Sequence, residues 1–169
     1  MVRKSSLREF QAYLATRLAG IDDRRPAGLL GFQSGGECWL IALPDSGEVI
    51  PLPPLTGVPM TRPWFAGIAN VRGSLHAVSD FSAFRQKEAT PRNASSRLLL
   101  IGTRHGNNVA LLVARILGLR NIDDLTPAES DPQAPPWASD AYMDREGQRW
   151  RMLDVRPLFS DDTFMNIGV

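Results

Sequence analysis

Side chains able to carry out catalytic or metal chemistry are few in this sequence, and they lie far apart. The chain has one cysteine, Cys38, and two histidines, His76 and His105. One cysteine cannot supply a cysteine-rich zinc site, and no ligand pair shows metal-binding spacing. His76 lies between apolar residues on a predicted strand, where it is an expected solvent-facing alternate, and His105 falls in a predicted exposed turn. We therefore predict no catalytic residue, no metal and no cofactor.

Enzyme motifs are absent as well. The sequence contains no GxGxxG, GxxxxGK[ST], HExxH or GxSxG pattern, which are the signatures of dinucleotide, phosphate, zinc-protease and hydrolase sites. Absence of a motif does not disprove catalysis, but it favours a binding or scaffolding role. The chain is predicted not to be an enzyme.

Charge is nearly balanced across the 169 residues. Lysine and arginine number 19 against 18 acidic residues, which gives a net charge of +1. A nucleic-acid-binding protein is expected to carry a clustered basic excess, so we predict no nucleic-acid partner. Only Lys4 and Lys87 are lysines, and the other basic residues are arginines. Codon bias in a GC-rich genome explains such an excess, while single arginines can still make planar, bidentate contacts at interfaces.

Compartment and membrane relations follow from the same counts. A single cysteine excludes an intramolecular disulfide. No apolar stretch is long enough to span a bilayer, and charged residues interrupt what would be the apolar run of a signal peptide. We expect a cytoplasmic protein without direct membrane insertion.

The chain divides into an arm and a domain. Residues 5–21 are predicted to form an amphipathic helix with one apolar stripe, which docks either on its own domain or on an external partner. Residues 22–26 form a charged linker, so residues 1–26 are the arm and 27–169 the domain. The stripe consists of Leu7, Phe10, Leu14, Leu18 and Ile21.

Short strands and frequent turns dominate after residue 26. A hairpin is predicted over Leu29–Phe32 and Glu37–Leu43, a brief edge strand over Gly47–Ile50, and a last hairpin over Ala141–Asp144 and Gln148–Leu153. Further strands are predicted over Leu98–Ile101 and Val109–Leu119. Residues 126–140 are expected to be a loop. Asp80 and Asp154 are predicted to cap short helices ending at Phe84 and Phe159. This pattern indicates a mainly β, small-barrel architecture.

Residues 64–84 are the most distinctive part of the sequence. Pro63, Gly67 and the run Asn70-Val71-Arg72-Gly73 lead into an apolar strand that ends at Asp80. Asn70 and Gly73 tolerate the positive φ of a tight turn, and Arg72 stands beside that turn.

From residue 29 to about 160 the chain resembles the CheW-like domain family, the coupling modules of bacterial chemosensory systems. The preceding helix and the terminal Phe164–Val169 segment resemble CheW-type adaptors of the PilI kind, which belong to twitching-motility (type IV pilus) systems. The residues that carry the resemblance are Phe32, Cys38–Ile41, Val49-Ile50, Val58-Pro59, Pro63–Gly73, Leu75–Asp80, Val109–Val113 and Tyr142–Leu153.

The resemblance implies a fold of two SH3-like β-barrels that share a core. It also implies a non-enzymatic adaptor between a methyl-accepting receptor's cytoplasmic tip and the CheW-homologous regulatory domain of a histidine kinase, recruited to membrane receptor arrays. The implied partner-binding residues are Arg72, Asn70, Val71 and Trp64, with Gly67 and Gly73 shaping the turn. Two alternatives stay open: Arg72 in an ion pair within the fold, with Asp80 or backbone carbonyls, and Trp64 in the core or a groove wall.

Two residues depart from the family pattern. Ala77 stands where the family usually has proline, and Ala114 replaces the family's aspartate after the Val109–Val113 strand. The rival interpretation is a β-barrel that binds a small ligand, with a hydrolytic activity that no motif reveals. A deep polar pocket around His76 would favour that rival, whereas a shallow apolar groove between two barrels would favour the adaptor.

Overall fold

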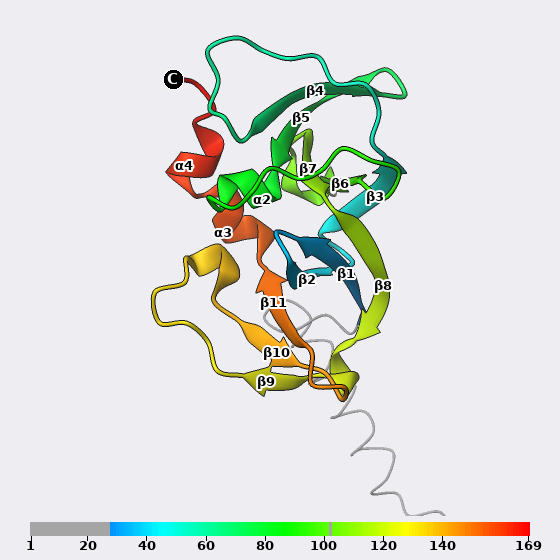
Figure 1. The fold of residues 1–169 in the computed structure, drawn as a ribbon, viewed down its shortest axis with the longest axis vertical. Coiled ribbons are helices and arrows are strands. Elements are labelled where there is room, and N and C mark those ends of the chain that lie inside the picture. The colour runs from blue at the N-terminus through cyan, green and yellow to red at the C-terminus, as the bar shows by residue number, and fades with distance from the viewer. Residues whose placement is uncertain (1–27, 102) are drawn as a thin grey trace, which may run out of the picture.

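The computed structural model describes residues 28–101 and 103–169, so the helix predicted over residues 5–21 lies outside the described residues. The described chain is mainly β, as predicted (Figure 1). Its elements, in chain order, are β1 (Gly28–Ser34), β2 (Glu37–Ala42), β3 (Ser46–Pro51), β4 (Phe65–Val71), β5 (Ser74–Asp80), α2 (Phe81–Phe84), β6 (Arg97–Ile101), η1 (Thr103–His105), β7 (Val109–Val113), β8 (Arg115–Asn121), η2 (Ile122–Asp124), β9 (Thr126–Ala128), η3 (Pro136–Ala138), β10 (Ala141–Met143), β11 (Arg149–Leu153), α3 (Val155–Phe159) and α4 (Asp162–Met165).

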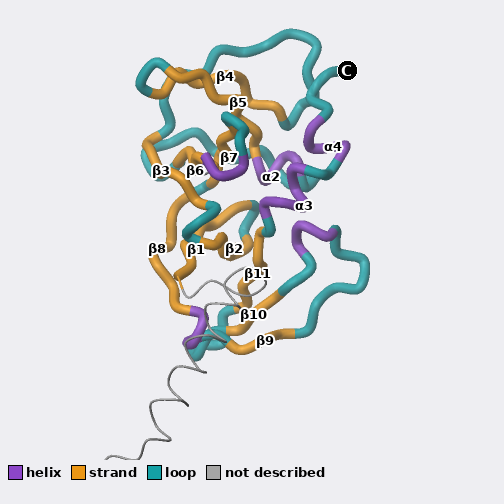
Figure 2. Tube along the Cα trace, turned by 180° about the vertical axis from the view of Figure 1, so that it is seen from behind, coloured by secondary structure: helices purple, strands orange, loops and turns teal. Residues whose placement is uncertain are grey.

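Two sheets form the framework. Sheet A has the strand order β8-β1-β2-β11-β10-β9, and sheet B has the order β3-β6-β7-β5-β4. Sheet A is therefore assembled from both ends of the described chain, while the five strands between them form sheet B. The helices α2, α3 and α4 lie together on one side of the molecule, where the two sheets meet (Figures 1 and 2).

Neither sheet is a closed barrel. In each sheet the two edge strands follow one another in sequence, β8 and β9 in sheet A and β3 and β4 in sheet B. Residues 122–125 connect the first pair, and the longer segment 52–64 connects the second. Among the described strands, however, no backbone ladder joins β8 to β9 or β3 to β4. Sheet B has only a bridge between Thr56, after β3, and Ile68 of β4. The expected pair of closed barrels is therefore corrected to two open sheets.

Strands β6 and β7, and the middle residues of β1 and β2, are buried on both faces. Leu99 and Ile101 of β6 enter a central core between the sheets, whereas Leu98 and Leu100 enter a second core belonging to sheet B. A third core, containing Leu40 and Trp150, belongs to sheet A. Because successive side chains of a strand point to opposite faces, a strand between two cores needs apolar residues at every position. This explains the uninterrupted apolar runs of the sequence.

Aromatic rings fill the centre of the shared core. Trp39 of β2 packs edge-on against Phe81 at 4.9 Å between ring centroids and stacks on Trp137 at 6.3 Å. The guanidinium groups of Arg85 and Arg151 lie 4.7 and 4.6 Å from the centroid of the Trp39 ring. Rings and cations in this geometry attract one another electrostatically in addition to burying apolar area.

The strand predicted over Val109–Leu119 is two strands in different sheets. β7 ends at Val113, and β8 begins at Arg115 after the chain has crossed from sheet B to sheet A. At the crossing the Ala114 N–H donates to the Gln33 carbonyl of β1, 2.9 Å away. The sequence obscures this break because apolar runs flank the pair Ala114-Arg115 on both sides.

Most of the shorter predictions are confirmed. Both hairpins, the edge strand β3, and the helices that end at Phe84 and Phe159 are present. Asp80 caps α2 as predicted, but Asp154 makes no side-chain capping bond to α3. The segment expected to be a loop, residues 126–140, also contains β9 and η3.

Gly67 allows the connection after β3 to approach β4. It lies at an irregularity in the β4–β5 ladder with a φ of 130°, and a Cβ placed there would lie 2.5 Å from the Thr56 carbonyl oxygen. Only glycine adopts such a backbone conformation without strain. Gly67 thus permits the Thr56–Ile68 bridge. It lies within β4, away from the hairpin turn that it was predicted to shape.

We predict that Gly67→Ala lowers the free energy of unfolding by about 2 kcal/mol or more, because strain and a backbone clash add. Urea denaturation measures the change. Gly57→Ala is the matched control, since no atom lies within 4 Å of its added Cβ, and it should stay within about 0.5 kcal/mol of the parent. Equal stability of the two variants would contradict the assigned role.

Asp144 organises the turn between β10 and β11. Its Oδ2 accepts a hydrogen bond from Trp150 Nε1 at 2.9 Å, and its Oδ1 accepts from the Glu146 and Gln148 N–H groups, each at 2.9 Å. The Trp150 bond is the main cause that lowers the pKa of the Asp144 carboxyl, and the two backbone bonds add to it. The ionised form is therefore the one that the folded chain stabilises.

This lowered pKa fixes the sign of a pH dependence. A carboxyl whose pKa is lowered on folding adds stability above its unfolded pKa and loses that contribution as the pH falls through its folded pKa. The melting temperature of the parent should exceed that of Asp144→Asn by a constant amount above about pH 5, and the difference should shrink below about pH 4. A difference that stays unchanged as the pH falls below about 4 would contradict it.

Candidate functional site

The β4–β5 hairpin ends in a two-residue turn that presents Arg72. Val71 and Ser74 pair across the hairpin, and the two residues between them have positive φ values, 53° for Arg72 and 84° for Gly73. Positive φ at both central positions is the pattern of the type I′ turn, which matches the twist of the flanking strands. Asn70 Oδ1 accepts the Gly73 N–H at 2.9 Å. The predicted tight turn is present, but Arg72, and not Asn70, takes the positive φ.

Arg72 makes an ion pair within the fold, although with neither of the partners expected. Its Nη2 bonds Glu48 Oε1 of β3, so a side-chain contact joins the hairpin tip to the opposite edge strand of sheet B. The Arg72 side chain is 76% exposed. An exposed pair of this kind contributes little to stability. Because most of the Arg72 side chain is exposed, its guanidinium remains open to a partner.

Asp80, the expected alternative partner of Arg72, is buried and fully engaged elsewhere. Its Oδ1 accepts the Ser82 and Ala83 N–H groups at 3.1 and 3.2 Å and the Thr90 hydroxyl at 2.6 Å. Its Oδ2 accepts the Thr90 N–H at 2.8 Å. These bonds start α2 and fasten the segment that follows it, residues 85–90, to sheet B.

The other predicted site residues differ in exposure. Asn70 is exposed beside the turn, and Val71 is half-buried against the core of sheet B. Trp64 is 8% exposed and packs between Phe84 and Phe164, with ring centroids 5.1 and 5.9 Å away. This arrangement fits the alternative in which Trp64 belongs to the core.

One face of sheet B carries an accessible strip that leads to the hairpin tip. In the strand register Ala77 lies between Ile68 and Val109, and Leu75 lies opposite Asn70, all on the same face. None of the five side chains is buried, and Leu75 is 60% exposed. We call Ile68, Asn70, Leu75, Ala77 and Val109 the hairpin strip.

An apolar groove of about 130 Å³ opens at the other end of the hairpin strip. Its floor consists of small or flat side chains on β4, β5 and β7, and its opposite wall comes from the C-terminal segment. The lining residues are Phe65, Ala77, Ser79, Val109, Phe164, Met165 and Ile167. Such a groove can accept apolar side chains from a partner helix.

Ala77 is also where the sequence departs from the family's proline. Its N–H donates to the Asn108 carbonyl at 2.9 Å, next to the start of β7. Proline has no N–H and could not make this bond. The departure therefore adds one backbone bond between β5 and the segment preceding β7, beside the groove.

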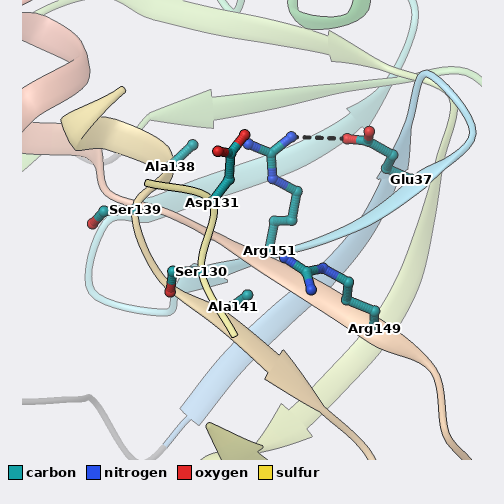
Figure 3. A pocket seen from close by; sticks show the side chains of 8 residues that line it. All are labelled: Glu37, Ser130, Asp131, Ala138, Ser139, Ala141, Arg149 and Arg151. Atoms are coloured by element: carbon teal, nitrogen blue, oxygen red, sulfur yellow. Dashed lines mark hydrogen bonds and ion pairs between the residues drawn. The ribbon is translucent and has the colours of Figure 1, made fainter. Parts of the chain in front are cut away.

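A second cavity, of about 190 Å³, is polar and lies on sheet A beneath the segment around Asp131 (Figure 3). Arg149 and Arg151 project from β11 into it, and Glu37 and Asp131 supply two carboxylates, so the charges of its lining balance. Arg151 bonds Glu37 at 3.2 Å, and Arg85 bonds the same oxygen at 2.7 Å. This cavity does not include His76.

Several interactions were not anticipated from sequence. Arg85 is the most consequential: its side chain is buried, stacks on Trp39 and donates to Glu37 and to the Ser34 carbonyl. Burial is the main cause that lowers the pKa of Arg85, and Glu37 opposes that shift. No sequence signal marks this role, because Glu37 lies 48 residues away from Arg85 in the chain.

His105 was expected to be exposed, and this prediction is wrong. Its Nε2 lies 2.7 Å from Asp45 Oδ1, and its ring packs edge-on against Phe159 at 5.7 Å.

In the part of the chain that the structure covers, no three His, Cys, Asp or Glu side chains gather as a metal site. Likewise, none of the described helices is long and apolar enough to cross a bilayer.

Comparison with known proteins gives consistent matches. A model of the CheW-like domain matches residues 28–163. Protein PilI of Pseudomonas aeruginosa is 28% identical over 147 residues, which cover 83% of this chain and 79% of PilI. The crystal structure of scaffolding protein TtCheW from Thermoanaerobacter tengcongensis aligns with a TM-score of 0.67 at 18% identity, covering 82% of this chain and 96% of that one. The fold is thus CheW-like.

We predict that Thr90→Val destabilises the fold by about 1–2 kcal/mol, because Asp80 loses a hydroxyl donor while its carboxylate stays buried. Thr90→Ser keeps that donor and should lose less than half as much. Urea denaturation of both variants provides the measurement. Equal losses would mean that the methyl group of Thr90, and not its hydrogen bond, is what matters.

Proposed function

The chain belongs to the CheW-like domain family, and we propose that it is a non-enzymatic adaptor that couples a methyl-accepting chemoreceptor to a histidine kinase. Within this proposal residues 27–169 form the coupling domain, and residues 1–26 are an arm outside it. The likeness to PilI supports a role in a type IV pilus chemosensory pathway that controls twitching motility.

The observation that carries the proposal is the surface of sheet B. An apolar groove leads along the hairpin strip to an exposed guanidinium held at a strained turn. A helical receptor tip offers an apolar ridge and carboxylates. The ridge suits the apolar floor of the groove, and a carboxylate suits Arg72 at the hairpin tip. Arg72 would then bind a receptor carboxylate, and Asn70 and Gly73 would hold the turn that presents it.

The rival function, binding of a small ligand with hydrolysis, has weaker support. Neither cavity includes His76, whose Nδ1 lies 3.3 Å from the nearby Ser74 carbonyl. Both cavities are smaller than the 300 Å³ or so at which small-molecule pockets usually begin. The apolar groove lies on sheet B against the C-terminal segment, and not between the two halves of the fold where it was expected, but it still offers an apolar surface to a partner helix.

Coupling needs a second surface for the kinase. We propose that the CheW-homologous regulatory domain of the kinase binds a face of the chain distinct from the groove, so that receptor and kinase are held at once. An adaptor shifts the kinase equilibrium only if it binds receptor and kinase states with different affinities. The chain would join receptor arrays at the membrane through these contacts.

Binding measurements on the full chain test the proposal. The immobilised chain is exposed separately to the cytoplasmic tip of a receptor and to the regulatory domain of a kinase, both encoded in the same genome. Binding of both, and of both together, is expected. Binding of neither would overturn the adaptor role.

Arg72→Glu should weaken receptor binding at least tenfold and leave kinase binding and the melting temperature unchanged. A reversed charge repels the receptor carboxylate, while loss of an exposed ion pair costs the fold little. Isothermal titration calorimetry gives both affinities.

Glu48→Gln is the matched control, because it removes the same ion pair but keeps Arg72. Receptor affinity should be equal to or above that of the parent, since the guanidinium is released. If Glu48→Gln weakens receptor binding as much as Arg72→Glu does, the ion pair itself is what matters, and the direct role of Arg72 is refuted.

A further inference from the structure

Residues 167–169 pair with residues 60–62 of the connection between β3 and β4. The Arg62 N–H donates to the Ile167 carbonyl at 2.7 Å, the Val169 N–H donates to the Met60 carbonyl at 3.1 Å, and Thr61 and Gly168 form an antiparallel bridge. We call residues 166–169 the C-terminal strap. Two backbone bonds attach this short segment to residues 60–62, so its hold depends on few contacts.

The strap follows a firm anchor. Phe164 is buried and packs against Trp64, Phe84 and Phe159, with ring centroids between 5.0 and 6.2 Å apart. Asp161 caps α4 and also accepts the Trp137 Nε1–H at 2.9 Å. Residues up to Phe164 are thus fixed by the core, and movement of the strap need not disturb them.

The strap covers the groove imperfectly. Met165 and Ile167 form one wall of the groove, while Ala77 and Ser79 on the floor are too small to reach them, which leaves the volume of about 130 Å³ between the two sides. Apolar surfaces that leave such a gap lose contacts that a better-fitting side chain would make. Met165 is 47% exposed, so it fills little of the space.

Strain is found where the strap is attached. Met60 has a φ of 59°, in the left-handed region that non-glycine residues disfavour, and its side chain is 77% exposed. No packing of that side chain explains the conformation. The Met60 carbonyl is the acceptor for Val169, so the strap bond coincides with the strained residue, and strain of this kind is common at clamps and switches.

We propose that the C-terminal strap is a releasable cover that competes, within the same chain, with an apolar helix ridge for the groove of sheet B. Release frees Ile167 from the groove wall and relieves Met60, while Phe164 stays in the core as the hinge point. The identity of the competitor rests on the proposed function, whereas the release itself does not.

Thiol labelling measures access to the groove without any partner. Ser79→Cys places a thiol on the groove floor, and its reaction with Ellman's reagent is compared in the full-length chain and in a chain lacking residues 166–169. Deletion should raise the labelling rate of this introduced thiol at least tenfold. Val169→Ser, which keeps the strap backbone, is the control and should change the rate less than twofold.

The native Cys38, half-buried against the core of sheet A, serves as an internal reference. Burial is the main cause that raises the pKa of its thiol, and because it lies on the other sheet it should react equally in all chains. Equal labelling rates of the introduced thiol with and without the strap would overturn the proposal.

Amide hydrogen exchange provides a second test. It uses the unmodified chain, so its result does not depend on whether a variant folds. The Arg62 and Val169 amides should exchange at least 100-fold faster than the Thr56 and Ile68 amides, which bond each other's carbonyls across the bridge at 2.9 and 2.8 Å. Exchange of Arg62 as slow as that of Ile68 would overturn the proposal, because the strap would then open only when sheet B unfolds.

Measurements of receptor binding distinguish the strap proposal from the proposed function. If deletion opens the groove and raises the affinity for the receptor tip about fivefold or more, the strap competes with the receptor, as proposed. If deletion opens the groove and leaves that affinity unchanged, competition is refuted for the receptor, and the groove loses its place in the proposed function. Loss of receptor binding on deletion would make the strap part of the binding surface and overturn its role as a cover.

Discussion

The two sheets share one core, and the rest of the structure depends on the burial of strands on both of their faces. Trp39 stands at the centre of that core, between the rings of sheet A, α2 and η3, and two guanidinium groups cover its ring. Arg85 and Arg151 both bond Glu37, so one carboxylate offsets part of the positive charge at this edge of the core. The shared core positions α2, and α2 together with Asp80 fixes the strand that leads to the hairpin tip.

Much of the fold could be predicted from local residue patterns. Apolar runs bounded by glycine, asparagine and proline were sufficient to predict both hairpins, the edge strand β3 and the capped helix α2, because each depends on neighbours in sequence. The sheet change at Ala114 was missed because it depends on a bond to Gln33 of β1, far away in the chain. Closure of the sheets was expected wrongly for the same reason: only long-range pairing decides whether curled edges meet.

The candidate site was predicted in part. The turn and its arginine follow from residue types, but the Glu48 partner does not, since it comes from the opposite edge of sheet B. Trp64 could be placed in the core or on the surface from sequence, and its position between Phe84 and Phe164 depends on the C-terminal segment folding back. The groove itself has no sequence signature, because its walls come from three strands and from α4 and the strap. What distinguishes Arg72, Arg85 and Arg151 is their surroundings, which composition cannot show.

The division of sheet A between the two ends of the described chain has a consequence for how the protein is made. During synthesis β1 and β2 emerge first, with both faces apolar and with β2 lacking its parallel neighbour β11. Sheet B, whose five strands are contiguous in sequence, can assemble while the chain is still being translated. The β1–β2 hairpin can pack one face on sheet B, through Trp39 and Ile41, but the edge of β2 stays unpaired until β11 is made. The order of translation thus makes completion of the shared core the final folding step.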